Sequence, residues 1–175
     1  QVLLNLFRAG FGSWTIVDKD RFFPHNQARH GLPGFLVGLP KAKGMEVIGN
    51  MLFGEADRVV GVVADALATP SATSKLAVAY GATKAVVDMS ASFPVARALA
   101  VDPLTAARRI SLFLNPTATH LVLLAEDEGR SHRLDDLEMQ LYRSIARGGP
   151  LGGHLRLPRS GEQFARGCRD VSFVI

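Results

Sequence analysis

The sequence contains a single cysteine, Cys168, among its 175 residues. One thiol excludes an internal disulfide and any zinc site built from several thiolates. No apolar run approaches the roughly 20 residues that a membrane-spanning helix needs. The first residues show neither the charged region nor the cleavage pattern of a signal peptide. We therefore expect a cytoplasmic protein with no membrane partner.

The chain also lacks any clustering of its charges. Lys and Arg number 20 against 16 for Asp and Glu, which gives a net charge of +4. No basic stretch interleaved with aromatic residues indicates nucleic-acid binding. The five histidines show no metal-ligand spacing such as H-E-x-x-H, and we expect His25 and His30 only to line a polar loop. The charge balance favours an acidic small molecule or protein as the partner.

What the sequence does contain is an alternation of short β-branched runs with segments of helical apolar spacing. A hydrophobic fraction of 47% is enough for one α/β domain with a core. The pattern predicts strands at 15–17, 58–63 and 84–88, and helices at 1–8, 40–53 and 71–80, the last two ended by Gly54 and Gly81. This β-α-β-α-β order predicts a mostly parallel sheet flanked by helices.

The second half of the chain predicts an antiparallel extension of that sheet. Two β-rich runs, 109–113 and 119–125, are separated by a turn cluster around Asn115. A helix follows, with Leu134 on its apolar face, acidic residues near its start and arginines near its end, as the helix dipole favours. A Gly/Pro-rich stretch, 148–161, then leads to a strand at 171–175. Such a stretch suits a crossover loop over an active site.

The most informative chemistry lies between residues 15 and 41. Asp18 falls where the first strand ends, and an acid at the carboxyl end of such a strand commonly binds the ribose hydroxyls of a nucleotide. Downstream, Asn26, Arg29 and Lys41 supply an amide and two cations, as a polyphosphate requires. Each of these residues alone is typical of a turn or of a solvated surface. Only their joint spacing favours a nucleotide site.

That spacing resembles the nucleotide-binding core of the ThiF/MoeB and ubiquitin-activating enzyme family, whose motif is D-x-D, then N-x-x-R, then G-x-P-K. The matching residues here are Asp18 and Asp20, then Asn26 and Arg29, then Gly38, Pro40 and Lys41. The resemblance is dense as far as Asp102 and becomes one of general architecture beyond it. It implies a single adenylation domain over 1–175 with an α/β, Rossmann-like fold.

The resemblance also implies a reaction. In this family, ATP adenylylates the C-terminal carboxylate of a small ubiquitin-like or sulfur-carrier protein, and the product is passed to sulfur or to a cysteine. The implied cofactors are ATP and Mg, and a homodimer is compatible with the family. Asp18, Asp20 and Asn26 would bind the nucleotide, and Arg29 and Lys41 would be the catalytic cations on its phosphates. Asp88, at the end of the strand 84–88, would contact the nucleotide and the metal.

The chain departs from the family pattern at three places. The glycine-rich turn G-x-G-x-x-G is missing, because Gly10 and Gly12 follow the first helix, and we expect a segment before Gln1 to carry it. The paired C-x-x-C zinc knuckles of many relatives are absent. In the family's D-x-x-D-N stretch, Ala91 stands at the second acid and Ser92 at the asparagine. Asp88 matches the first acid, which is often only a strand-end cap.

Two further residues have a functional and a structural interpretation. Cys168 is flanked by Arg166 and Arg169, and neighbouring cations favour the thiolate of a nucleophile that would receive the activated carrier. A lone cysteine is equally typical of a small apolar side chain in a core. Asp65 follows the second strand and either reaches the adenine side of a nucleotide or is a loop acid.

Two other functional classes stay open from the sequence. A nicotinamide-dependent oxidoreductase fragment would also carry an acid that binds ribose. Asn26, Arg29 and Lys41 argue against that class, because hydride transfer needs no downstream phosphate clamp. A non-catalytic Rossmann-like interaction domain is favoured by Ala91 and by the missing glycine turn.

Overall fold

A computed structural model describes residues 1–28, 30–68, 74–103, 105–115, 117–155, 162–163 and 173–174. The chain divides into two compact units, and among the described residues the first consists of 1–76 and the second of 77–155 with the two short C-terminal strands. Each unit has its own sheet and its own helices, so each is described by itself.

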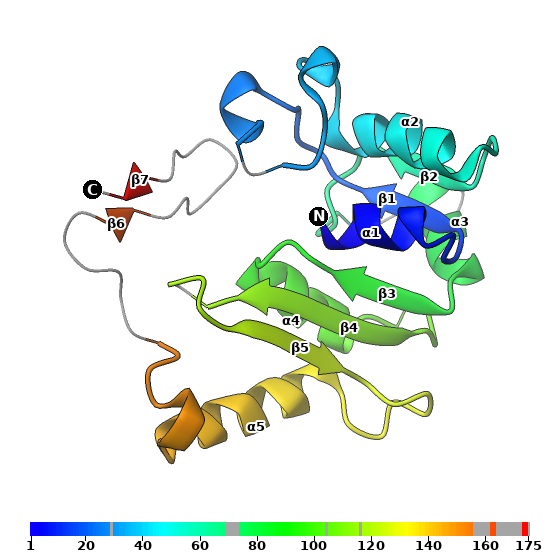
Figure 1. The fold of residues 1–175 in the computed structure, drawn as a ribbon. Helices are drawn as coiled ribbons and strands as arrows, with labels where there is room; N and C mark the ends of the chain where they lie inside the picture. Colours follow the sequence, from blue (N-terminus) through cyan, green and yellow to red (C-terminus); the bar gives the residue numbers. More distant parts are fainter. Residues whose placement is uncertain are drawn as a thin grey trace. The chain divides into compact units, whose positions relative to one another are not determined.

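The first unit consists of two parallel strands, a long helix that connects them and a polar loop between the first strand and that helix (Figure 1). Ile16 of one strand lies opposite Gly61 of the other. The elements are α1 (Val2–Arg8), β1 (Trp14–Val17), η1 (Pro24–Asn26), η2 (Gly34–Leu36), α2 (Lys41–Phe53) and β2 (Val59–Val62). The predicted helix and strands of this region are confirmed with shifts of one or two residues at their ends.

The bounds of α2 follow from its sequence. Pro40 precedes the first helical residue, with an extended ψ of 136°, which suits a residue that fixes its own φ and needs no backbone N–H. Gly54 follows the last residue with a left-handed φ of 68°, a conformation that glycine adopts without steric cost. Because α2 connects two parallel strands, it runs antiparallel to them. Its N-terminus with Lys41 therefore lies at the carboxyl ends of β1 and β2.

Helix α2 packs unusually close to β2. A Cβ on Gly61 would lie 2.4 Å from the carbonyl oxygen of Ala42, so only glycine permits this approach. The same closeness lets two α2 side chains cover the outer edge of β2. Glu46 Oε2 accepts the N–H of Gly61 at 2.9 Å, and Asn50 exchanges two hydrogen bonds with the backbone of Val59, at 2.8 and 3.0 Å. Three backbone groups on the outer edge of β2 are thus hydrogen-bonded without another strand.

The apolar core of the first unit forms between α1, α2, β2 and the loop that precedes α2. Phe7 of α1 is 1% exposed and contacts the rings of Trp14 and Phe53, with centroids 6.3 and 5.7 Å apart. The other fully buried members are Leu4, Phe22, Leu32, Leu36, Met45 and Val59. Three of them, Phe22, Leu32 and Leu36, come from the polar loop. The loop is therefore fixed to the unit by its own apolar side chains.

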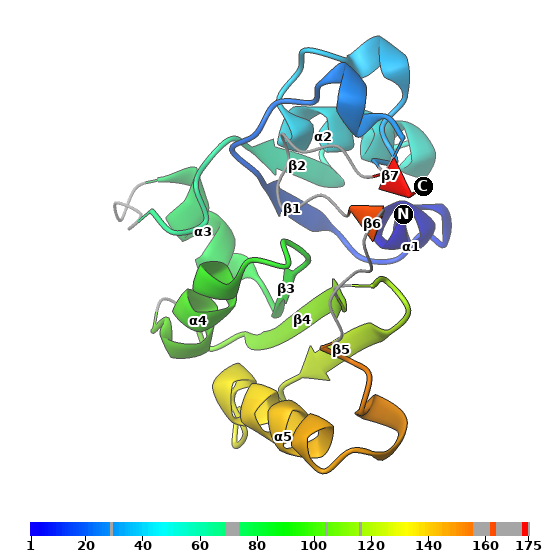
Figure 2. The same cartoon turned by 90° about the vertical axis from the view of Figure 1, so that its left-hand side faces the viewer.

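The second unit is a three-stranded sheet in the order β3-β4-β5, with α4 and α5 on one face (Figure 2). Strands β3 and β4 are parallel, and β4 and β5 are antiparallel. The division between the units falls within α3 (Lys75–Ala82). The elements that follow are β3 (Ala85–Asp88), α4 (Phe93–Val101), β4 (Arg108–Leu114), β5 (Leu121–Ala125), α5 (Leu134–Ala146), η3 (Gly149–Leu151), β6 (Glu162–Gln163) and β7 (Phe173–Val174).

The antiparallel extension and the helix after it are confirmed, and two details of the second unit differ from the sequence analysis. Helix α3 continues past Gly81 by one residue, because a glycine near a helix end costs only about 1 kcal/mol. Helix α4 follows Ser92 and was not predicted, although Pro94 near its start is a typical helix signal. Residues 69–73 and most of 156–175 lie outside the described residues, so the predicted helix start at 71 and the crossover loop are untested.

A buried ionic cluster joins the elements of the second unit. Glu126 is 1% exposed, and its carboxylate accepts hydrogen bonds from the N–H of Arg109 at 2.9 Å, the N–H of Leu134 at 3.0 Å and Nε of Arg130 at 2.7 Å. Burial alone would raise the pKa of Glu126, but the Arg130 side chain and the two amides hold it below its usual value. This residue fixes the start of α5 to β4.

None of the helices in the described ranges is long and apolar enough to cross a bilayer.

Candidate functional site

The candidate site lies in the first unit, where β1 ends and the polar loop begins. The backbone N–H of Asp18 continues the sheet by donating to the carbonyl of Val62 at 3.2 Å. The Asp18 side chain then turns back, and its Oδ1 accepts the N–H of Asp20 at 2.7 Å. Burial raises the pKa of Asp18, although this hydrogen bond and the charge of Lys41 oppose the rise. A half-buried carboxylate thus stands at the strand end, as the sequence predicted.

The two ends of the polar loop are held together by backbone pairing. Phe22 donates to the carbonyl of Leu39 and Gly38 donates to the carbonyl of Phe22, both at 2.8 Å. Arg21 pairs with Pro40 as an isolated antiparallel bridge, and its guanidinium donates to the carbonyl of Gly38 at 2.8 Å. This pairing brings the D-x-D residues next to the G-x-P-K residues, which are about twenty positions apart in the sequence.

Among the described residues of the first unit, Lys41 is the most deeply buried charge. Its side chain is 5% exposed, and its ammonium lies 3.5 Å from Oδ2 of Asp20. Its backbone N–H donates to the carbonyl of the same Asp20 at 2.8 Å. A buried ammonium is costly unless acidic groups surround it, and Asp18 and Asp20 fulfil that condition. The arrangement keeps a fixed positive charge at the strand ends, where an anionic ligand would meet it.

Asn26 is buried at 2% exposure and determines the shape of the loop. Its Oδ1 accepts the N–H of Phe23 at 2.9 Å, and its backbone carbonyl accepts the N–H of His30 at 2.8 Å. The oxygen of the Asn26 amide is therefore used inside the protein. A direct contact between Asn26 and a nucleotide stays a prediction.

His30 is a site residue to which the sequence analysis gave no chemical role. Its Nδ1 accepts the N–H of Leu32 at 3.3 Å, and its ring contacts that of Phe22 with centroids 5.4 Å apart. Burial, followed by the charge of Lys41, lowers the pKa of His30 to about 4. The ring is therefore neutral near pH 7. Only its place directly after Arg29 in the motif could have drawn attention to it.

The chain was compared with protein families, curated proteins and solved structures. The sequence matches no family model, and it matches no curated protein. Six chains of solved structures are similar. One of them is E. coli MccB, in a crystal structure with succinimide, with a TM-score of 0.59 and 15% sequence identity over 86% of this chain. The fold is Rossmann-like. At this identity the likeness concerns the fold alone, and this chain spans 45% of that protein's length.

In a Rossmann-like fold, the carboxyl ends of the parallel strands are the expected ligand position, and Asp18, Asp20 and Lys41 occupy that position in the first unit. Arg29 and Cys168 lie outside the described residues. The phosphate contact predicted for Arg29 and the nucleophilic role predicted for Cys168 therefore stay predictions.

Asp88 belongs to the second unit and acts there as a cap at the end of β3. It is 6% exposed, and its Oδ1 accepts both the N–H of Ser90 at 2.9 Å and the hydroxyl of Ser90 at 2.6 Å. Ala91 has a left-handed φ of 53°, and Ser92 precedes the first residue of α4. In the part of the chain that the structure describes, no three His, Cys, Asp or Glu residues gather as a metal site. The metal role of Asp88 stays a prediction.

Asp65 forms an exposed ion pair on the rim of the first unit. Its Oδ2 lies 2.7 Å from the ammonium of Lys19, and its Oδ1 accepts the N–H of Leu67 at 2.9 Å. The hydrogen bond from Lys19 is the main reason why the pKa of Asp65 lies below its usual value. This contact connects the loops that follow β1 and β2. It favours the interpretation of Asp65 as a loop acid.

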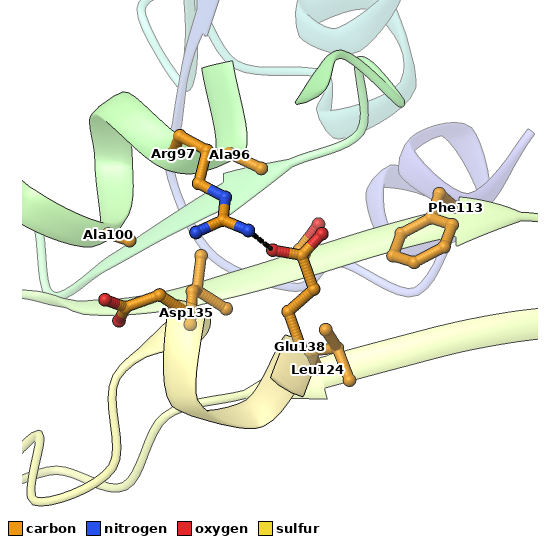
Figure 3. Close-up of a pocket in the computed structure, with 9 residues that line it drawn as sticks. Ala96, Arg97, Ala100, Phe113, Leu124, Asp135 and Glu138 are labelled. Carbon is orange, nitrogen blue, oxygen red and sulfur yellow. Dashed lines mark ion pairs between the residues drawn. The ribbon is translucent and has the colours of Figure 1, made fainter. Parts of the chain in front are cut away.

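A small cavity of about 20 Å³ lies within the second unit between α4, α5 and the sheet. Figure 3 shows Arg97 of α4 reaching toward Glu138 of α5. Nη2 of Arg97 lies 3.2 Å from Oε2 of Glu138. Phe113 and Leu124 line the cavity from the strands. A volume of this size accommodates one water molecule and no organic ligand. The Arg97–Glu138 pair therefore fastens α4 to α5 rather than forming a ligand site.

Proposed function

We propose that the first unit carries the nucleotide-binding site of an enzyme that uses ATP to adenylylate the C-terminal carboxylate of a small ubiquitin-like or sulfur-carrier protein. The observation that supports this proposal is the buried ammonium of Lys41, held by Asp20 beside the strand-end carboxylate of Asp18. The ordered motif and the Rossmann-like fold agree with it. A buried cation at that position suits a phosphate chain.

The proposed reaction requires no added acid or base. An ionised carboxylate oxygen of the carrier attacks the α-phosphorus of ATP. The bond from that phosphorus to the oxygen bridging to the β-phosphate breaks, and pyrophosphate leaves with that oxygen and its electron pair. Negative charge spreads over the phosphate oxygens during this exchange, and Lys41 and Arg29 would stabilise it. Asp18 would accept hydrogen bonds from the ribose hydroxyls.

The residues fit ATP better than they fit an enclosed metal site. ATP needs a ribose acceptor and phosphate cations, and the first unit brings an acceptor and a buried cation together at Asp18 and Lys41. Magnesium is usually held by one or two carboxylates together with the phosphates of the substrate. The metal contact expected of Asp88, which lies in the second unit, stays a prediction, and no step of the proposed reaction depends on the metal.

A second step would pass the activated carrier to Cys168. The thiolate would attack the acyl carbon of the adenylate, the bond from that carbon to the phosphate oxygen would break, and AMP would leave. In the complete protein with its carrier, Cys168→Ala should abolish a thiol-labile adduct while pyrophosphate exchange continues, because the adenylylation step needs no thiol. A thiol-labile adduct that persists in Cys168→Ala would place the nucleophile at another residue.

The nucleotide site is tested by titrating the isotope-labelled chain with Mg-ATP and with NAD. We expect the backbone amides of Asp18, Asp20 and Lys41 to shift with ATP at millimolar concentrations, with weak affinity because the chain lacks the glycine turn. Lys41→Ala should remove these shifts, and Lys43→Ala, which removes a more exposed lysine two positions further on, should preserve them. Equal shifts with NAD, or none with ATP, would contradict the proposal and favour the oxidoreductase or the interaction domain.

A further inference from the structure

The ring of His30 is held in one orientation by its neighbours. Its backbone N–H donates to the carbonyl of Asn26 at 2.8 Å, which fixes the residue at the end of the η1 turn. The ring packs against Phe22, whose side chain is fully buried in the core. Its Nδ1 accepts the N–H of Leu32 at 3.3 Å. These three contacts come from residues on both sides of His30 and leave the ring little freedom to turn.

The contact with Leu32 determines which ring nitrogen carries the proton. A backbone N–H can only donate, so Nδ1 must be the acceptor, and the proton of the neutral ring resides on Nε2. Nε2 forms no hydrogen bond with any described residue. It is also not one of the described polar atoms that are buried without a partner, so solvent reaches it. His30 therefore offers an accessible N–H donor.

This donor lies close to the start of α2, because the His30 ring packs against Phe22, whose backbone N–H donates to the carbonyl of Leu39, two residues before Lys41. Burial, the Lys41 ammonium and the charge of the N-terminal amine together lower the pKa of His30 to about 4, so His30 and Lys41 contribute one positive charge and not two near pH 7. A neutral N–H adds direction to anion binding without adding long-range attraction. That combination suits a site that must hold a phosphate chain during the reaction and release pyrophosphate afterwards.

We propose that His30 is a specificity-determining residue of the site, and that its Nε2–H donates a hydrogen bond to a phosphate oxygen of the same anionic ligand that Lys41 attracts. This inference rests on the proposed function, because it assigns an additional contact to the same nucleotide. The neutral state of the ring also explains why a histidine is compatible with the nearby buried lysine, Lys41. A protonated ring there would be repelled by Lys41.

The test measures the ring nitrogens of the labelled chain by NMR, with and without Mg-ATP and with inorganic pyrophosphate alone. We expect the Nε2–H form in the free protein. Either phosphate compound should shift the His30 ring signals and raise the pH at which the ring titrates, because a nearby anion stabilises the protonated form. A ring protonated on Nδ1, or ring signals unchanged while the Lys41 and Asp18 amides shift, would overturn the His30 contact and leave the nucleotide site intact.

Variants separate the hydrogen bond from the shape of the ring. His30→Phe keeps a ring against Phe22 but removes the donor, and it should weaken ATP binding about tenfold. His30→Gln restores an N–H donor and should recover most of that loss. His25→Phe is the matched control, because His25 is exposed in the same loop and stacks on Phe23. Wild-type affinity in His30→Phe would overturn the contact, whereas no ATP-induced shift anywhere in the first unit would overturn the proposed function as well.

Discussion

Lys41 and Asp20 are joined twice, because the ammonium of Lys41 lies 3.5 Å from Oδ2 of Asp20 and its backbone N–H donates to the Asp20 carbonyl at 2.8 Å. The backbone contact fixes where α2 begins relative to the loop. The side-chain contact balances the charge of Lys41, whose side chain is 5% exposed. One residue pair thus positions both the helix start and the cation of the candidate site. A substitution such as Lys41→Ala removes the side-chain charge and keeps the backbone hydrogen bond to Asp20.

Removing the cations of the site should abolish the proposed chemistry. In the complete protein, we expect Lys41→Ala and Arg29→Ala each to lower carrier-dependent ATP–pyrophosphate exchange by a factor of about 100 to 1000, as is typical for the loss of one charge-stabilising donor. Lys43→Ala removes a more exposed lysine that pairs with Glu46 and should leave the exchange near the wild-type rate. Wild-type exchange in both site variants would rule out this clamp.

The stability of the first unit should depend on pH through His30. The folded protein holds the pKa of His30 at about 4, below its usual value of 6.5. Between these values the unfolded chain binds a proton that the folded chain does not, so the free energy of unfolding should fall as the pH drops from 6.5 to 4. We expect a loss of about 2 kcal/mol after solvent screening of the partly exposed ring.

His30→Gln should remove this part of the pH dependence, which urea unfolding at a series of pH values can measure. His25→Gln is the control in the same loop and should retain the wild-type slope. An identical slope in the wild-type protein and in His30→Gln would show that the ring is protonated to the same extent in both states.

The close contact between α2 and β2 should make Gly61 intolerant of a side chain. A methyl group there would lie 2.4 Å from the Ala42 carbonyl oxygen, so we expect Gly61→Ala to lower the free energy of unfolding by about 2–4 kcal/mol. Gly81→Ala places the same methyl group in open space within α3 and should stabilise by about 0.5–1 kcal/mol. Equal effects of the two substitutions in urea unfolding would contradict this packing.

The buried carboxylate of Glu126 should be essential to the second unit. Glu126→Gln removes the negative charge that pairs with Arg130. It also replaces one acceptor oxygen by an NH₂ group, which cannot accept the hydrogen bonds that this oxygen accepted. We expect a loss of about 3 kcal/mol in the free energy of unfolding. Glu128→Gln, at an exposed position two residues further on, should change stability by less than about 0.5 kcal/mol. Similar midpoints for the two variants in denaturant unfolding would show that the cluster contributes little.

Much of the local structure could be read from the sequence. The bounds of α2, the antiparallel pair of β4 and β5 and the course of α5 follow from apolar spacing, Pro40, Gly54 and the turn around Asn115. These signals act between residues a few positions apart. Helix α4 was missed because the residues before it, Ala91 and Ser92, were interpreted only as part of a family motif, and Pro94 was not considered as a helix signal.

The placement of two residues of the candidate site was predicted, whereas their role in nucleotide binding stays a prediction. Asp18 at a strand end follows from the run of β-formers before it, and its approach to Lys41 follows from the ordered motif. The sequence contained no indication of the Nδ1 contact of His30, because that contact depends on how the loop folds over Phe22. It also contained no indication that the Asn26 oxygen would be used by the Phe23 amide.

The amino-acid sequence by itself determined which segments become helices and strands and which charged residues follow the strand ends, because periodicity, caps and turn residues act through neighbouring backbone. Tertiary structure alone decided that Lys41 is buried beside Asp20, that His30 stays neutral, and that α2 covers the edge of β2. These properties depend on burial and on hydrogen bonds between residues far apart in the chain. Desolvation and the placement of donors are fixed only when those distant segments pack together.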